Sequence, residues 1–476
     1  MGIEVTGGAG GTAVALDALE SAAAGLRRAA GSLVEVVARV AAGSLAVELG
    51  PGSAVSPVTA VRAKAAVLEA TGPTGLAGDV LVLEGLGSAA WAAVETYRAG
   101  EAAVADGVAA AQDAVMLAVG HALPEVVVGV LALDALGVDV AGFLDRGVYD
   151  LPALVGLTGG VEGLVAGLAS NPVTAPFLLP GELSRRPGEP GLAGLPLGSD
   201  ERALRVLADS AASLGLLEDG QRARVTAEGS GAAGSAPTDL ADLTRDLSDL
   251  GGGADQPDRV RVVEVVGERG SAWLLEVPGT RVWGPRASGS PFDLTTDVRL
   301  MAQESTVLAA GATEALSRAQ ASCGHDTSGE PVMLVGHSLG GIVAAGLASS
   351  PRFRSGHGRL SVVTLGAPVS RMPVPADVSV LSLEHVQDAV PRLDGAGNPD
   401  REGWVTVTRD LRGDADGVET ATRAHATSEY VQTAAGADAS DSTSMRVWRQ
   451  GHAGFFAPAA GAASVVRDYR VERVVP

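Results

Sequence analysis

The sequence predicts an α/β domain with a mainly parallel sheet in its C-terminal half, preceded by an α-helical bundle domain. Three observations carry this prediction. Apolar runs typical of strands alternate with helical patterns from residue 260 onward, an order that favours a parallel sheet covered on both faces. Alanine-rich segments with a helical period fill the first 170 residues. Between them the composition shifts toward proline, glycine and acidic residues. We therefore expect domains at 1–170 and 260–476, joined by a linker at 171–259.

The N-terminal segments 13–49 and 58–117 have apolar residues at every third or fourth position, as in LDALESAAAGLRRAAGSLVEVVARVAAGSLAVEL. That spacing places the apolar side chains on one face of a helix. The intervening GPGSAVSP, residues 50–57, is a helix breaker. The two segments are therefore expected to fold back as an antiparallel helical hairpin, and 118–170 continues in the same style.

Two later stretches, 121–144 and 151–170, are strongly apolar. A membrane-spanning helix needs about 20 apolar residues with few charges. The first stretch carries three acidic residues, and the second carries Glu162 and five glycines. We expect buried helices of a bundle here and no clear membrane span.

The segment 171–259 differs from its neighbours in composition. It begins with NPVTAPFLLPGELSRRPGEPGLAGLPLG, which is linker-like in its proline and glycine content. A helical pattern follows at 201–217, and DLADLTRDLSDLGGGADQPD indicates a short acidic helix with a flexible exit.

The C-terminal segment contains six strand-like runs, with long helical patterns at 293–320 and 339–349 between them. The runs are at 259–266, 272–277, 332–336, 360–366, 378–384 and 404–408.

The composition excludes some partners. The net charge is −21, and 34 of the 35 basic residues are arginine, a skew that fits a GC-rich coding bias. Phosphate groups of nucleic acids and anionic lipids would be repelled, so we expect a small, neutral or lipid ester substrate and no nucleic acid. Cys323 is the only cysteine, so the fold needs no disulfide, and we assign the thiol no role. We expect no metal and no organic cofactor.

The stretch VMLVGHSLGGIVAAGLAS has the pattern of a nucleophile elbow: a buried strand, then G-x-S-x-G, then a helix with small residues. Gly336 and Gly340 leave room for the neighbouring strand and helix, so the hydroxyl of Ser338 stands free above the sheet edge. The start of the following helix stabilises negative charge beside it. Ser338 is the predicted nucleophile.

A serine nucleophile needs a histidine to remove its proton and an acid to orient that histidine. In a fold with this elbow the acid follows the serine and the histidine comes last. Asp388 follows a strand end and is the preferred acid, ahead of Asp394 and Asp377. Among the histidines, His425 lies in a loop that opens into a helix and is preferred over His452.

The oxyanion of the tetrahedral intermediate needs hydrogen-bond donors. The backbone N–H of Leu339, after the nucleophile, is one candidate. The second is expected after an earlier strand, and AWLLEVPGTRVWG places Pro278, Gly279 and Thr280 there. Thr280 offers both its N–H and its hydroxyl.

Together these motifs resemble the class 3 lipases, the fungal triglyceride lipase type of α/β hydrolase, over roughly 260–435. The resemblance rests on the elbow GHSLGG, on TLGAP at 364–368, on Asp388-Ala-Val-Pro-Arg-Leu393 and on His425 five residues before Tyr430. It implies the Ser338–Asp388–His425 triad and carboxylic ester hydrolysis. Pro278 and Leu294 depart from the family pattern, and no amphipathic lid is visible, which favours a soluble ester.

The N-terminal half resembles, more weakly, the helical hairpins of actinobacterial type VII secretion substrates. The pattern is Trp91 followed by Tyr97-x-x-x-Glu101 in AAWAAVETYRAGE. The N-terminus lacks the basic start and apolar core of a secretory signal. The resemblance implies a cytoplasmic protein or one exported without such a signal, with a protein partner for the helical domain.

The expected function is therefore a serine esterase or lipase. Two alternatives stay open: a secreted interaction or effector protein, and a hydrolase fold that serves as an inactive scaffold.

Overall fold

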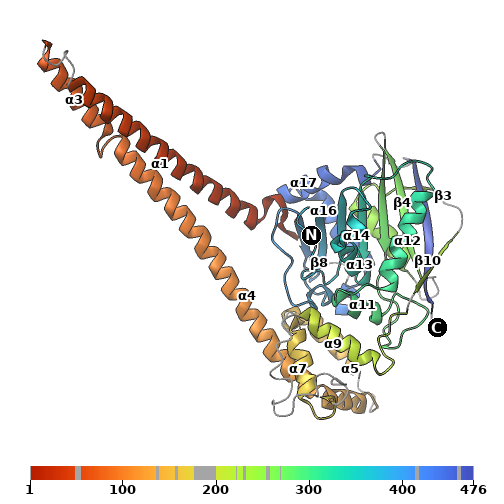
Figure 1. Ribbon diagram of the computed structural model, residues 1–476. Coiled ribbons are helices and arrows are strands. Elements are labelled where there is room, and N and C mark those ends of the chain that lie inside the picture. Colours follow the sequence, from red (N-terminus) through yellow and green to blue (C-terminus); the bar gives the residue numbers. More distant parts are fainter. Residues whose placement is uncertain are drawn as a thin grey trace. The chain divides into compact units, whose positions relative to one another are not determined.

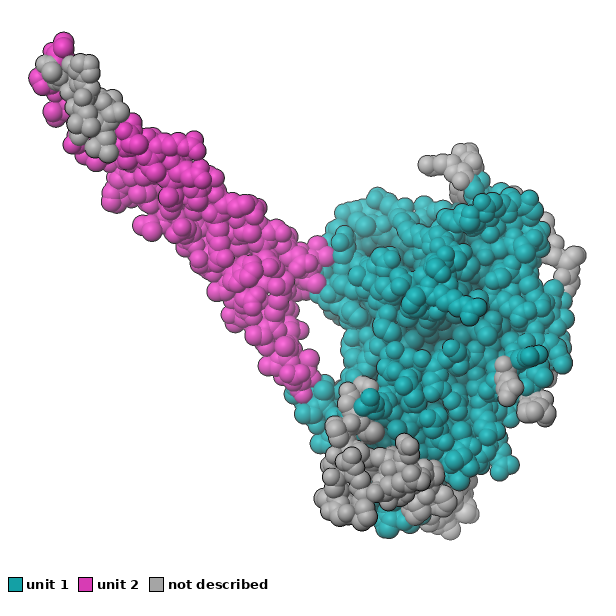
Figure 2. Space-filling model, in the orientation of Figure 1, with its two compact units in different colours: residues 1–11, 107–476 teal, residues 12–106 magenta. Residues whose placement is uncertain are grey.

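The structure is a computed structural model that describes residues 2–48, 55–135, 139–155, 159–175, 200–220, 222–228, 232–252, 258–267, 270–412, 417–457 and 463–474. The chain forms two compact units, which are coloured separately in Figure 2. One comprises residues 1–11 and 107–476, and the other comprises Thr12–Asp106. These ranges differ from the domain limits expected from composition, because the first eleven residues and residues 107–170 belong with the C-terminal unit.

The unit Thr12–Asp106 is helical. It contains α1 (Thr12–Glu48), α3 (Pro57–Thr71) and the first part of α4 (Leu76–Ala135). Arg98 of α4 forms ion pairs with Asp17 and Glu20 of α1, and Arg27 lies over the ring of Trp91. These contacts pair α1 with α4. Trp91 and Tyr97 both lie inside α4, with no turn between the helices at Trp91.

A mixed sheet forms the centre of the larger unit (Figure 1). Its strand order over the described residues is β1-β9-β8-β7-β6-β5-β4-β10-β2, with β3 paired to β10. Strands β5 to β9 are parallel, and the outer strands on both sides are antiparallel. The strands are β1 (Ile3–Gly7), β2 (Arg222–Ala227), β3 (Ala232–Ser235), β4 (Arg259–Gly267), β5 (Gly270–Val277), β6 (Val332–His337), β7 (Leu360–Leu365), β8 (Ser379–His385), β9 (Trp404–Arg409) and β10 (Ala463–Val474).

Helices cover both faces of this sheet and create two apolar cores. On one face α12 (Val307–Ala321) and α13 (Leu339–Ser349) bury alanine, leucine and valine side chains against β5, β6 and β7. On the other face α10 (Leu240–Gly251), α16 (Thr427–Ala439) and α17 (Thr443–His452) pack on the same strands. The α/β architecture with a mostly parallel centre is thus confirmed.

The six expected strands are all present, and four others were not foreseen: β1, β2, β3 and β10. β1 lies in the segment expected to be helical and pairs with β9. β2, β3 and α10 lie in the expected linker, yet α10 buries six side chains in the sheet domain. This part of 171–259 is therefore folded structure, since its apolar positions complete the core.

The pattern at 293–320 forms two helices instead of one. α11 (Leu294–Met301) ends before Gln303, which has a φ of 58°, and α12 begins at Val307. Thr306 caps α12 by accepting a hydrogen bond from the N–H of Ala309. A left-handed residue followed by a new N-cap ends the first helix and starts the second.

Further helices lie at the carboxyl ends of the parallel strands. α5 (Val140–Asp150) packs on α15 (Ala421–Ala424), and α9 (Asp200–Ala212) packs on both α11 and α7 (Val161–Ser170). Figure 1 shows α5, α7 and α9 grouped beside α11. The remaining short helices are α6 (Pro152–Val155) and α14 (Pro351–Arg354).

Among the described residues, the helical stretch Pro57–Val127 is long and apolar enough to cross a membrane. It is not the stretch that the sequence singled out as most apolar. Its length and composition do not separate a membrane span from a helix of a soluble protein. The expected buried helices at 121–144 and 151–170 fall in part outside the described residues, and Val126 and Val127 are exposed.

Candidate active site

Ser338 lies at the junction of β6 and α13 in a strained conformation. Its φ is 52° and its ψ is −120°, which is the region that favours glycine. A Cβ on Gly336 would lie 2.0 Å from the carbonyl carbon of Gly340, and a Cβ on Gly340 would lie 1.8 Å from the Val277 oxygen. Only glycine fits at these two positions. The turn therefore has the geometry of a nucleophile elbow.

Asp388 is fully buried three residues after the end of β8. One of its oxygens, Oδ2, lies 2.7 Å from Nδ1 of His425 and accepts a hydrogen bond of 2.6 Å from the hydroxyl of Tyr430. Its Oδ1 accepts from the N–H of Val390. Burial alone would raise the pKa of Asp388, but the charge of His425 and these hydrogen bonds outweigh it and lower that pKa. The carboxylate is ionised at neutral pH.

His425 has one nitrogen bound and the other without a partner. Because the carboxylate of Asp388 accepts, the Nδ1 of His425 carries the proton, and Nε2 of the neutral ring holds the lone pair. This Nε2 is buried and has no hydrogen-bond partner among the described residues, Ser338 included. The ring of His337, next in the chain to Ser338, lies 4.6 Å from the ring of His425. The imidazole thus lies beside the elbow with a basic nitrogen unused.

Two further histidines, His337 and His385, hydrogen-bond to the backbone at His425. Neither was predicted from the sequence to have a role. Nε2 of His337 lies 2.7 Å from the carbonyl oxygen of His425, and Nδ1 of His385 lies 2.7 Å from that of Ala424. A carbonyl only accepts, so each nitrogen donates. Burial lowers the pKa of His337 to about 3 and that of His385 to about 4, so both rings are neutral at physiological pH. Their one sequence signal is position: each lies at the end of a strand.

The expected oxyanion loop packs directly on the elbow. A Cβ on Gly279 would lie 3.2 Å from the Cβ of Ser338, which places Thr280 close to the nucleophile. The hydroxyl of Thr280 donates to Oδ2 of Asp297 at 2.9 Å. Burial raises the pKa of Asp297 to about 7. A hydroxyl has one proton, so while it donates to Asp297 the N–H of Thr280 is its remaining donor.

Leu339 is the first residue of α13 and is fully buried. The N–H groups of the first helical turn have no intrahelical acceptor and lie at the positive end of the helix dipole. This is the physical basis for considering Leu339 as the second donor.

The alternative residues weighed in the sequence analysis lie elsewhere. Asp394 accepts from the N–H and hydroxyl of Ser370. Asp377 is exposed and faces Arg354. His452 is buried, with Nδ1 on the Trp448 carbonyl and Nε2 on the hydroxyl of Ser361, near the amino end of β7. The structure brings Asp388 and His425 together and places His452 at the opposite edge of the sheet.

Helices α5, α7 and α9 lie at the carboxyl ends of the parallel strands, as do the loops that carry Asp388 and His425. The N–H of Thr422 donates to Asp145 of α5, and Arg371, after β7, pairs with Asp200 of α9. A cavity of about 330 Å³ lies between α7, α9, α11 and the loop after β7. Its lining contains Met301, Pro368 and Met372 but none of the proposed catalytic residues. Ser338 itself is 4% exposed.

Residues 296–449 match a protein-family model described as PGAP1-like alpha/beta domain. The match covers about a third of the chain and includes Ser338, Asp388 and His425, whereas Thr280 lies outside it. The C-terminal region therefore has a PGAP1-like α/β domain, a fold of the α/β-hydrolase type. No curated protein and no solved structure matches the chain. Membership of the class 3 lipases is not confirmed.

Proposed function

We propose that this chain is a serine hydrolase that cleaves carboxylic esters through an acyl-enzyme on Ser338. The observation that carries the proposal is the 2.7 Å hydrogen bond from His425 to the buried Asp388, beside a serine with an elbow conformation. The hydrogen bond fixes the tautomer that a general base needs, because it leaves Nε2 as the proton acceptor.

In the proposed reaction the Ser338 oxygen attacks the ester carbonyl carbon while its proton moves to Nε2 of His425. The carbonyl oxygen becomes an oxyanion, which the N–H groups of Leu339 and Thr280 stabilise. Collapse of this intermediate breaks the bond to the alcohol, which leaves with the proton from Nε2. Water then attacks the acyl-enzyme in the same manner and releases the acid.

A lipase-like ester specificity of the class 3 type is part of this proposal. The matched elbow and the Asp388-Ala-Val-Pro pattern support it. The low exposure of Ser338 favours a small ester over a lipid aggregate.

An active-site probe tests the proposal. Purified full-length protein is treated with a fluorophosphonate and assayed with p-nitrophenyl esters of increasing acyl length. We expect stoichiometric labelling of the wild type, loss of labelling in Ser338→Ala, and hydrolysis that disappears with it. Ser349→Ala, at the far end of α13, is the matched control and should retain both. A wild type that neither labels nor hydrolyses would instead support the inactive scaffold.

A further inference from the structure

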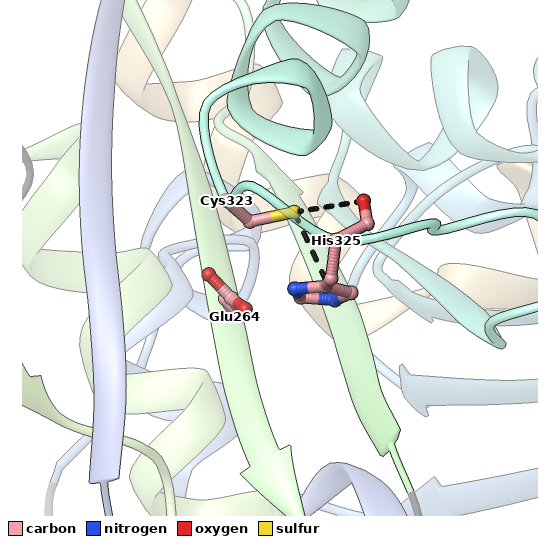
Figure 3. A group of neighbouring side chains, drawn as sticks. All are labelled: Glu264, Cys323 and His325. Atoms are coloured by element: carbon pink, nitrogen blue, oxygen red, sulfur yellow. Dashed lines mark hydrogen bonds between the residues drawn. The ribbon is translucent and has the colours of Figure 1, made fainter.

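A second group of reactive side chains lies at the amino ends of the parallel strands, opposite the candidate active site. Figure 3 shows Glu264, Cys323 and His325 facing one another. Glu264 comes from β4, and the other two come from the connection between α12 and β6. Glu330, just before β6, lies within reach of His325. Neither the nucleophile elbow nor the acid and histidine loops include any of these residues.

The separation of the sulfur and nitrogen donors is close to that around a tetrahedral zinc ion. The Sγ of Cys323 lies 3.8 Å from Nε2 of His325, which lies 3.2 Å from Oε1 of Glu330. Zinc–sulfur and zinc–nitrogen bonds of about 2.3 and 2.0 Å at a tetrahedral angle give separations of about 3.6 Å for S···N and about 3.3 Å for N···O. Glu264 contributes an oxygen within 4.8 Å of both Cys323 and His325. A side-chain shift of about 1 Å would bring it to the same spacing.

The carboxylates are already held in place by other groups. Ser271 donates its N–H to Oε1 of Glu330 and its hydroxyl to Oε1 of Glu264. The indole N–H of Trp273 donates to Oε2 of Glu330 at 2.6 Å. Outer hydrogen bonds of this kind orient the ligands of a metal site.

The charges of the group also suit a divalent cation. The carboxylate of Glu264 lies 3.3 Å from the guanidinium of Arg467, and that of Glu330 lies beside His325. A cysteine ligand binds metal as a thiolate and so adds a third negative charge when it loses its proton. With one guanidinium and one divalent ion present, the charges cancel. The His325 side chain is 42% exposed, which leaves an entry path from solvent.

We propose that Cys323, His325 and the carboxylate of Glu264 form a zinc site, with Glu330 beside His325. The donor set of one sulfur, one nitrogen and carboxylate oxygens is one that Zn²⁺ accepts, whereas Mg²⁺ and Ca²⁺ prefer oxygen alone. The ion would tie the α12–β6 connection to β4. This proposal is independent of ester hydrolysis, since the two sites lie at opposite ends of the strands.

Metal titration of the reduced, full-length protein tests the site. Co²⁺ serves as a spectroscopic probe, and Zn²⁺ affinity is measured by competition with a chromophoric chelator. We expect one equivalent of Co²⁺ to give a thiolate-to-metal charge-transfer band in the near ultraviolet together with tetrahedral visible bands, and Zn²⁺ to abolish both. Cys323→Ser should remove the charge-transfer band and weaken Zn²⁺ binding by at least about 100-fold.

The variants His325→Asn and Glu264→Gln should also weaken Zn²⁺ binding, whereas His121→Asn, at an exposed histidine bonded to Ser170, is the matched control. A rise in melting temperature on adding Zn²⁺ that is lost in Cys323→Ser provides a second readout. The proposal fails if the wild type binds no Zn²⁺ saturably, or if Cys323→Ser binds it as tightly as the wild type does.

Discussion

Two histidines at opposite edges of the sheet, His452 and His425, differ in how their ring nitrogens are bonded. At the amino edge, His452 has a partner for each ring nitrogen. At the carboxyl edge, His425 has a partner for Nδ1 only, and its buried Nε2 is left open among the described residues. A fully bonded imidazole is a structural group, because its lone pair is already used. The unpartnered Nε2 identifies His425 as the candidate base. Four predictions test this distinction between a structural and a catalytic imidazole.

The largest effect is expected at the carboxyl edge from Asp388→Asn. The amide would donate to Nδ1 instead of accepting from it, so His425 would adopt the wrong tautomer. We expect kcat for a p-nitrophenyl ester to fall by about 10⁴-fold. Asp394→Asn is the matched control, because the carboxylate of Asp394 accepts hydrogen bonds from Ser370. This variant should change kcat much less. Equal losses in both variants would remove Asp388 from the proposed triad.

At the amino edge, His452→Ala should affect stability and leave catalysis unchanged. It removes the side-chain hydrogen bonds to the Ser361 hydroxyl and the Trp448 carbonyl and opens a cavity against the indole. The expected loss in free energy of unfolding is about 3 kcal/mol. Urea unfolding measures the loss, and kcat/KM of the folded variant should stay within about twofold. His425→Ala should show the reverse pattern, and a catalytic defect in His452→Ala would break the comparison.

Glu276 on β5 tests whether a buried polar group without a hydrogen-bond partner is always a functional group. Among the residues that the structure describes, neither of its carboxylate oxygens has a hydrogen-bond partner, and burial raises its pKa to about 8. A raised folded-state pKa means that the folded chain binds more protons, so stability falls as pH rises from about 4.5 to 8. Glu276→Met should remove that loss and raise the free energy of unfolding at pH 8.5 by about 1–3 kcal/mol.

The control for this prediction is the same pair of proteins at pH 5, where the wild-type carboxyl is protonated and the gap should shrink. Unfolding curves of both proteins at the two pH values measure the gap in stability, and kcat at pH 7 measures any effect on catalysis. A large loss of kcat in Glu276→Met would mean that this carboxyl also takes part in the reaction.

The smallest effect is expected for Thr280→Val. The hydroxyl of Thr280 is already donated to Asp297, so the N–H is the proposed oxyanion donor and survives the substitution. We expect kcat to fall by no more than about tenfold, against the 10²–10³-fold typical for loss of an oxyanion donor. A 10³-fold loss would assign the hydroxyl to the oxyanion.

The central strands could be predicted from the sequence, because strands β4 to β9 are apolar runs bounded by turn residues. β10 was missed, since arginine, aspartate and glutamate alternate with its valines in SVVRDYRVERVV. β1 and β2 lie at the margins of the sheet, where one neighbour suffices and the apolar signal is weak.

The residues of the candidate active site could be proposed from the sequence because their signals are short, local patterns. Ser338 and Asp388 each follow a strand, His425 lies two residues before α16, and the elbow and Asp388-Ala-Val-Pro patterns are contiguous in the chain. The support from His337 and His385, and the approach of Glu264 to Cys323, depend on residues far apart in sequence. No spacing rule reveals such contacts, because the sheet register creates them.

The position of β1 has a practical consequence for shortening the chain. Since β1 precedes α1 and hydrogen-bonds to β9 along its whole length, the helical unit is an insertion into the sheet domain and not an extension before it. A truncated protein starting at residue 107 would lose the hairpin and β1 together. Its newly bare β9 backbone would be a template for intermolecular strand addition and precipitation, whereas replacing 12–106 with a linker would keep β1 on that edge.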